Sequence, residues 1–441
     1  MPQIDSHQRC QAQDLLRFID ASPSPWHAVA RMIEWLEEEG FCGLDERESW
    51  RLEACGRYYV LRDDSSLIAF VLGTDPLPEA GFRLVGAHTD SPGLRLKPNP
   101  AHAAEPMLRL GVEIYGSPIL ATWTDRDLSL AGRVALRGET PTVCLVDFEE
   151  ALVRLPNLAI HMNREVNETG LKLDKQTELP LLLAVLEQEL PPAQQFLKLL
   201  AECIDCSEQA ILGFELCAYD THKGAFWGAE GEFIASSRLD NLASCHAALE
   251  ALLAEEETAA TRVVALFDHE EVGSESFKGA GSSFLQDCLF RIGAALGLGP
   301  SEVRRALAAS FLISADMAHA FHPNFSGWYD SEHKLVINQG PAIKVNANLR
   351  YTTEAFSQAL FIGWCEEANV PFQLYVHRST LSCGTTIGPI ASARLGVRSL
   401  DVGNPLWAMH SVRESAGTCD HAFLIGALTQ FFACPRIPVS G

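Results

Sequence analysis

The sequence predicts an α/β protein with a β-rich domain inserted into it. Apolar runs of the length expected for buried strands occur at residues 81–87, 263–267 and 308–315, separated by stretches with helical periodicity. Each of these runs ends in a histidine or an acidic residue. Residues 107–175 instead contain short alternating segments and few helical runs, a pattern typical of antiparallel strands.

The first part of the α/β domain is expected to contain two helices, a hairpin and a strand. The helices lie within residues 9–39 and are separated at 21–25, where two prolines remove backbone donors and Ser22 or Ser24 provides an N-cap. The remaining elements are expected at residues 58–61 and 66–73 for the hairpin and 81–87 for the strand.

The insertion is expected to begin at the proline-rich stretch 94–100. Its expected strands are 108–115, 128–136, 142–148, 210–218 and 225–229, and its expected helical pieces are 179–189 and 192–200. The α/β pattern returns at Phe233. We therefore predict an α/β domain formed by residues 1–93 and 234–441, interrupted by a β-rich domain at 94–233.

The second part of the α/β domain contains the longest amphipathic helix. It follows the polar turn 236–241, and Leu239, His246 and Leu249 are spaced for one buried face. Strands are expected at 263–267, 308–315 and 400–402. The glycine-rich stretch 278–283 lacks the spacing of a phosphate-binding loop and is predicted to be an ordinary loop.

Composition excludes several classes of partner. The 34 basic and 57 acidic residues give a net charge of −23, which argues against nucleic acid and anionic membranes as partners. No apolar run approaches the roughly 20 residues that span a bilayer. Thirteen scattered cysteines without a secretory signal favour a reducing cytoplasm.

Several expected strand ends and turns carry residues that can bind metal. His88, Glu271 and Asp316 follow three separate apolar runs, Asp240 lies at a helix start, and His410 follows a fourth strand. Taken singly, each has an ordinary explanation: a charged turn, a helix cap or a packed histidine. Such residues at the ends of three separate strands are improbable as independent accidents, and ligands gather at strand ends in α/β sheets.

Together these five residues supply two histidines and three acids, enough for two metal ions that share Asp240 as a bridge. Nitrogen and oxygen donors without thiolates favour zinc, with cobalt or manganese as substitutes. Glu270 is adjacent and is the candidate general base, taking a proton from a bridging water that attacks a carbonyl. Asp90 would orient His88.

Six motifs in register resemble the M18 metallopeptidases, the aspartyl aminopeptidases, and most closely their bacterial members. The motifs are AHTDSPGLRLKPNP, SSRLDNLAS, FDHEEVGS, SADMAHA, CGTTIGP and GNPLWAMHSVRES, and the similarity extends from SPSPWHAV near Ser22 to the C-terminal helix. The resemblance implies a mixed-sheet zinc-peptidase catalytic domain, interrupted by a β-rich dimerisation domain. It also implies two zinc ions per subunit and a tetrahedral dodecamer.

The resemblance further implies roles for residues outside the metal set. Lys344 would meet the acidic side chain of the substrate, and the site would be lined by Tyr351, His319 and Met409, with His161 reaching in from a neighbouring subunit. A net-acidic enzyme that selects an acidic residue needs a placed cation, which Lys344 provides, and the alternative is that Lys344 is a solvated surface lysine. Thr380 stands where family members usually have an aspartate three residues before the CGTTIGP cysteine, so specificity is open to change.

We therefore predict a dizinc aminopeptidase that removes N-terminal Asp or Glu from peptides. The first alternative is a related dimetal aminopeptidase or deacylase that prefers neutral substrates, because the metal site is generic and the pocket sets specificity. The second is a non-catalytic assembly protein or peptide-binding module, which would have no need to keep Glu270.

Overall fold

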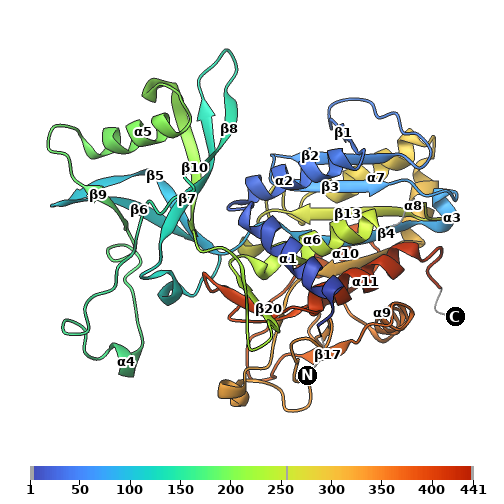
Figure 1. The fold of residues 1–441 in the computed structure, drawn as a ribbon. Coiled ribbons are helices and arrows are strands. Elements are labelled where there is room, and N and C mark those ends of the chain that lie inside the picture. The colour runs from blue at the N-terminus through green and yellow to red at the C-terminus, as the bar shows by residue number, and fades with distance from the viewer. Residues whose placement is uncertain (1–3, 255–256, 439–441) are drawn as a thin grey trace.

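Two lobes make up the protein, and both chain ends lie on the larger one (Figure 1). The computed structural model describes residues 4–254 and 257–438. The large lobe is a nine-stranded sheet covered by helices, and the small lobe is built around a six-stranded sheet. Mixed sheets with packed helices confirm the predicted α/β class.

The nine-stranded sheet has the order β1-β2-β3-β13-β4-β14-β18-β16-β17. Its four central strands, β13, β4, β14 and β18, are mutually parallel, whereas β3 and β16 pair with them in antiparallel fashion. The carboxyl ends of the four parallel strands therefore meet at one edge. The strands are β1 (Cys42–Leu44), β2 (Arg57–Arg62), β3 (Ser66–Val71), β4 (Phe82–His88), β13 (Thr261–Phe267), β14 (Phe311–Ala315), β16 (Ala342–Val345), β17 (Gln373–Val376) and β18 (Arg398–Gly403).

Helices cover both faces of this sheet, which explains why its strands are apolar throughout rather than alternating. Val264 and Leu266 of β13 pack on one face and Val263 and Ala265 on the other. The first face is covered by α1 (Ser6–Asp20), α2 (Pro25–Glu38), α6 (Leu239–Leu253), α9 (Ala355–Glu367) and α11 (Asp420–Ala433). The second is covered by α3 (Leu77–Ala80), α7 (Phe284–Ala295), α8 (Pro300–Ala308) and α10 (Ile387–Leu395).

The small lobe is an antiparallel sheet in the order β8-β7-β10-β5-β6-β9. One helix, α5, packs on it, and α4 lies near the tip of a long loop (Figure 1). The elements are β5 (Gly93–Ala104), β6 (Met107–Tyr115), β7 (Leu128–Leu136), β8 (Thr142–Asp147), α4 (Val166–Thr169), β9 (Leu181–Val185), α5 (Pro192–Cys203) and β10 (Ile211–Asp220).

A third sheet joins the end of the insertion to the C-terminal part of the large lobe. Its order is β11-β12-β20-β19-β15. The hairpin of β19 and β20 carries residues 408–413 in its loop, which places His410 beside the main sheet. The strands are β11 (Ala225–Trp227), β12 (Phe233–Ser236), β15 (Ala318–His319), β19 (Pro405–Trp407) and β20 (Glu414–Gly417).

Four local expectations differ from the structure. Residues 179–189 contain strand β9 instead of a helix, because this leucine-rich run pairs with the edge of β6. Residues 94–100, the proline-rich stretch at which the insertion was expected to begin, lie within strand β5. Strand β14 begins at Phe311, since α8 extends through Ala308. Helix α6 is buried almost all round, instead of on one face, because α1, α11 and the sheet enclose it.

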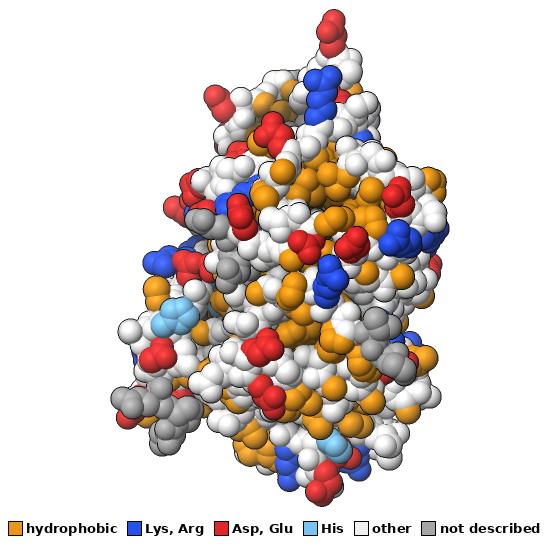
Figure 2. Space-filling model, turned by 90° about the vertical axis from the view of Figure 1, so that its right-hand side faces the viewer, with side chains coloured by type: hydrophobic (Ala, Val, Ile, Leu, Met, Phe, Trp, Pro, Cys, Tyr) orange, Lys and Arg blue, Asp and Glu red, His pale blue; other side chains and the backbone are white. Residues whose placement is uncertain are grey.

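The surface agrees with the acidic composition. Figure 2 shows the end of the large lobe that faces away from the small lobe, where acidic side chains lie scattered among hydrophobic ones. On this face the described Lys and Arg side chains form no continuous stripe. In the part of the chain that the structure describes, no helix has both the length and the apolar character needed to cross a membrane.

Candidate metal centre

The predicted metal ligands converge at the carboxyl edge of the parallel strands. His88 is the last residue of β4, Asp316 directly follows β14, and Glu271 lies four residues beyond the end of β13. Asp240 comes from the start of α6 and His410 from the loop between β19 and β20. Five residues spread over 323 positions of the chain therefore meet at one place in the fold.

The five side chains form two groups that share Asp240. Its Oδ1 lies 3.6 Å from His88 Nε2, which is 3.8 Å from Asp316 Oδ1. Its Oδ2 lies 3.3 Å from His410 Nε2, which is in turn 3.3 Å from Glu271 Oε1. One carboxylate thus presents one oxygen to each group, as a bridging ligand between two cations must.

Asp240 does not act as a conventional helix cap. Asp240 has a ψ of 105° and Arg238 has a φ of 56°, and both angles lie outside the α-helical region. The Asp240–Asn241 peptide bond is cis. Asn241 donates to the carbonyl of Ala315 and so ties this turn to the end of β14. Among the described residues, Oδ1 of Asp240 is buried without a hydrogen-bond partner. A buried carboxylate oxygen without a partner suits a ligand better than a cap.

Asp90 organises the residues on one side of the centre. Its carboxylate accepts the backbone N–H groups of Glu270 and Glu271, both at 3.1 Å, and the hydroxyl of Tyr115 at 2.6 Å. His88 Nδ1 is 3.0 Å from the backbone oxygen of Asp90 and 3.4 Å from the carboxylate. The ring is therefore oriented mainly by the main chain, while the carboxylate fixes the two glutamates.

Glu414 holds the other side, and the sequence analysis did not single it out. It is 2% exposed and accepts the N–H of Asp240 at 2.9 Å and the N–H of His410 at 2.7 Å. Burial, and then the charge of Asp240, raise its pKa to about 8. The positive charge of a protonated His410 opposes this rise in the pKa of Glu414. The only sequence signal was an acid four residues after His410.

The small lobe contributes two main-chain groups and the hydroxyl of Tyr115 to the centre. The carbonyl of Ser117 lies 3.2 Å from His410 Nδ1, and Ile119 donates its N–H to the carbonyl of His410 at 2.9 Å. Tyr115, at the end of β6, reaches Asp90 from the same segment. Residues 115–119 of the insertion therefore form one wall of the centre.

The local field favours positive charge. Burial would lower the pKa of His88, but Asp240 and Asp316 raise it well above its ordinary value. Burial likewise opposes the effect of Asp240 and Glu271 on His410, whose pKa rises to about 11. Burial raises the pKa of Glu271 to about 7. Crowded carboxylates of this kind, with two imidazoles, fit divalent cations that accept nitrogen and oxygen ligands.

Glu270 lies beside His88 without making a short contact to its imidazole. Its Oε2 is 3.9 Å from His88 Nε2, and its side chain is 13% exposed. Burial raises its pKa well above the ordinary value for a glutamate. A carboxylate that is near the ligands and accessible from solvent can exchange protons with a bound molecule.

The predicted substrate residues are divided between two places. His319 and Met409 line a cavity of about 220 Å³ together with His377 and Arg378, which the sequence analysis missed. Burial, and then Lys344, lower the pKa of His319 to about 4, so its imidazole is neutral.

Lys344 and Tyr351 are buried behind the candidate metal ligands. Lys344 Nζ donates to the carbonyl of Met317 at 2.6 Å, lies 3.6 Å from Asp316 Oδ2 and stands over the ring of Tyr351. Its position excludes the alternative of a solvated surface lysine. His161 lies in an exposed loop between β8 and α4, and Thr380 is exposed next to Arg378.

Comparison with known proteins places this geometry in a family. The family model described as Aminopeptidase I zinc metalloprotease (M18) matches residues 18–432. A probable M18 family aminopeptidase 2 from Ectopseudomonas mendocina is 47% identical over 433 residues, which are 97% of this chain and 99% of that protein. A protein of the same name from Pseudomonas fluorescens is 45% identical over 429 residues, again 97% and 99% of the two chains.

Solved structures agree. A chain in a cryo-EM structure of the Ape4 and Nbr1 complex superposes with a TM-score of 0.94 at 38% identity, covering 98% of this chain and 88% of that one. The S. cerevisiae mApe1 dodecamer gives 0.85 at 26% identity and 97% of both chains. An M18 aminopeptidase from Thermotoga maritima shares the fold, with a TM-score of 0.88 at 22% identity and coverage of 98% and 97%. The chain belongs to the M18 family of metallo-aminopeptidases, as its motifs predicted.

Proposed function

We propose that the chain is a two-metal aminopeptidase that removes N-terminal Asp or Glu from peptides. The observation that carries the proposal is the pair of ligand groups joined by Asp240, with Glu270 beside them. His88 and Asp316 would hold one ion, and Glu271 and His410 the other. The description of the matching family model supports zinc as the metal.

When bound, the two ions would supply Lewis acidity to the scissile carbonyl and to the attacking water. The remaining work falls to protein groups. Glu270 takes the proton of the water and delivers it to the nitrogen of the leaving amine. The carboxylate of Asp90 accepts the backbone N–H of Glu270, so the main chain of the general base is held in place and its side chain does the proton transfer.

Selection of an acidic residue requires a cation, and two are candidates. Lys344 is the one implied by the family resemblance, but its ammonium group already contacts Met317 and Asp316. Arg378 lines the cavity that also contains His319 and Met409. Either cation would have to act against a chain of net charge −23, which would otherwise repel an acidic substrate.

The engagement of Lys344 gives specific support to a second candidate, a dimetal aminopeptidase with a preference for neutral residues. In that case Lys344 positions Asp316 rather than the substrate. The exposed threonine at position 380, in place of the usual family aspartate, is the second feature that distinguishes this pocket.

The mApe1 structure is described as a dodecamer, and we infer that this chain also forms a homo-oligomer, as a tetrahedral dodecamer. Exposed apolar side chains on the small lobe, including Leu158, Ile160 and Met162, support an interface there, and His161 lies among them. From such an interface His161 would reach a neighbouring active site. The cysteines are all free thiols, which supports a cytoplasmic location.

The test is hydrolysis of matched peptides that begin with Asp, Glu, Ala, Leu or Lys, before and after chelation and after zinc is restored. We expect zinc-dependent cleavage with a strong preference for Asp and Glu. Lys344→Met and Arg378→Met identify the selecting cation, because loss of that residue abolishes the preference and spares slow cleavage of Ala and Leu peptides. Zinc-dependent cleavage of neutral peptides by the unaltered enzyme would refute acidic specificity while keeping the metal centre.

A further inference from the structure

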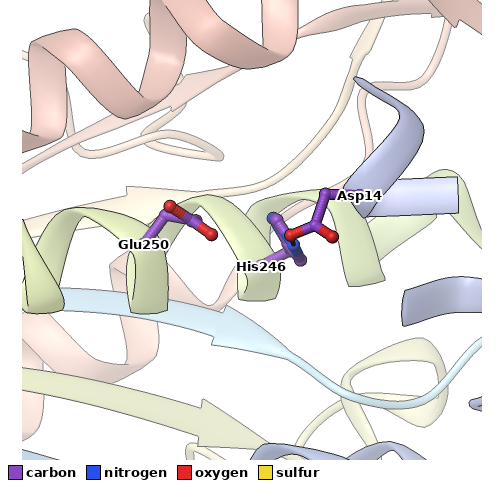
Figure 3. Close-up of side chains that lie close together, drawn as sticks. All are labelled: Asp14, His246 and Glu250. Atoms are coloured by element: carbon purple, nitrogen blue, oxygen red, sulfur yellow. Dashed lines mark ion pairs between the residues drawn. The ribbon is translucent and has the colours of Figure 1, made fainter. Parts of the chain in front are cut away.

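A second group of potential metal ligands lies outside the centre, where α1 packs against α6 (Figure 3). Asp14 comes from α1, and His246 and Glu250 come from successive turns of α6. One ligand atom from each residue lies within 4.8 Å of the other two. Figure 3 shows Asp14 facing the imidazole, with the Glu250 carboxylate turned toward it from the next turn.

The two oxygens of Asp14 face different partners. Oδ1 is 3.0 Å from the guanidinium of Arg17, and Oδ2 is 3.5 Å from His246 Nε2. A good N–H···O hydrogen bond is about 2.9–3.0 Å long. Two ligand atoms of a tetrahedral zinc ion, with bonds of about 2.0–2.1 Å, are separated by about 3.3–3.4 Å. The spacing of Asp14 and His246 is therefore closer to that of two ligands on one cation.

The imidazole of His246 is held so that Nε2 faces Asp14. It is 1% exposed, packs between the rings of Phe18 and Trp35, and its Nδ1 is 2.9 Å from Nε2 of the buried His421. Histidines that bind metals usually have their second ring nitrogen fixed by a hydrogen bond in this way. With Nδ1 as the donor of this bond, Nε2 keeps its lone pair and faces Asp14.

There is room for a cation and for water beside it. A cavity of about 230 Å³ borders Asp14 and His246. Glu250 is half-buried and makes no hydrogen bond or ion pair among the described residues. The neighbouring imidazole of His246 lowers the pKa of Asp14 to about 2, although burial opposes this, so the carboxylate is ionised. Arg17 contacts Asp14, whereas Arg31, which also lines the cavity, is paired with Glu34.

We propose that Asp14, His246 and Glu250 form a further site for a divalent transition-metal ion, with zinc preferred, that cross-links α1 to α6. The site would be structural. His246 follows Asp240 by six residues, roughly 9 Å along a helix, so the ion would fix the helix that presents the shared acid without touching the catalytic centre.

The experiment measures zinc per chain and melting temperature in intact enzyme equilibrated with a graded series of buffered Zn²⁺ concentrations. The variants are Glu250→Gln and Asp14→Asn, which change charge with little change in shape, and His246→Gln as a third. Glu113→Gln, an exposed acid of β6 in the small lobe, is the matched control.

We expect the unaltered enzyme and Glu113→Gln to bind one zinc ion more than the three variants and to gain a further rise in melting temperature over the same range of Zn²⁺. Peptidase activity at saturating zinc should be equal in all folded proteins. Identical zinc content and identical thermal shifts in the unaltered enzyme and in folded Glu250→Gln would overturn the proposal.

Discussion

Glu414 offers a sharp test of how the candidate metal ligands are held in place. In Glu414→Gln, the amide oxygen can still accept one backbone N–H, but the NH₂ group faces the other. One of the two N–H groups, of Asp240 or His410, then loses its acceptor in a buried place. An unsatisfied buried donor costs about 1–3 kcal/mol.

The destabilised groups belong to the main chain that presents Asp240 and His410, so the change should appear as weaker metal binding. If all of the cost reaches the centre, about 1.4 kcal/mol per tenfold gives a loss of roughly 5–150-fold in affinity. This agrees with the 10–100-fold typical of residues that orient metal ligands. Glu414→Ala, which leaves both donors without acceptors, should lose more.

The assay is competition for Zn²⁺ against a chelator of known affinity, with peptide hydrolysis at saturating zinc as a second readout. Glu113→Gln, an exposed acid on β6, is the control for loss of one negative charge. Zinc affinity in Glu414→Gln within threefold of the control, with the same activity, would show that the two hydrogen bonds do not position the ligands.

Three other changes test separate parts of the structure. Glu270→Gln should keep its zinc and its melting temperature but lose several orders of magnitude in kcat, of which about 10²–10⁴ is the usual share of a general base; near-normal turnover would remove Glu270 from the mechanism. Burial lowers the pKa of His421 well below 6.5, so its contribution to stability is present above about pH 6.5 and is lost as the pH falls and the unfolded chain takes up the proton. Unfolding followed from pH 7 to 5 should therefore show a shallower decline in His421→Gln, by up to about 1.4 kcal/mol per pH unit, and equal slopes would contradict this. Phe431→Ala should lower the free energy of unfolding, measured by chemical denaturation, by about 3–5 kcal/mol, because this ring is fully buried and its centroid lies 4.9 Å from that of Trp364. A loss below 1 kcal/mol would mean that neighbouring side chains move in to fill the cavity.

The strands that end at the candidate centre could be predicted from the sequence for a physical reason. A strand covered on both faces must be apolar throughout, so a polar residue marks where it leaves the core, as at His88 and Asp316. The same logic failed at residues 181–185, where a leucine-rich run suits a helix by propensity and becomes a strand only because β6 has a free edge. Propensity yields to pairing that the local sequence does not encode.

Contacts made by main-chain groups could not be predicted from the residue types. The carbonyl of Ser117 orients His410 whichever side chain stands at position 117. Glu414 was visible as an acid in a motif, but its two partners are N–H groups 174 and 4 residues away. Residue type and strand position could therefore predict that the candidate ligands meet, and that Asp90 lies beside His88, whereas the parts played by Ser117 and Glu414 could not be predicted.

The backbone at His410 explains why those orienting groups matter. Its φ of 67° and that of Ala408, 55°, lie in the left-handed region, which costs a non-glycine residue about 1–3 kcal/mol. Glu414 accepts the N–H of His410, Ile119 donates to its carbonyl, and Ser117 meets its ring. Two of these three restraints come from the inserted lobe. The small lobe therefore helps to hold the candidate metal centre: without it, the His410 loop would have less to offset its strain, and the imidazole would lose its direction toward Asp240.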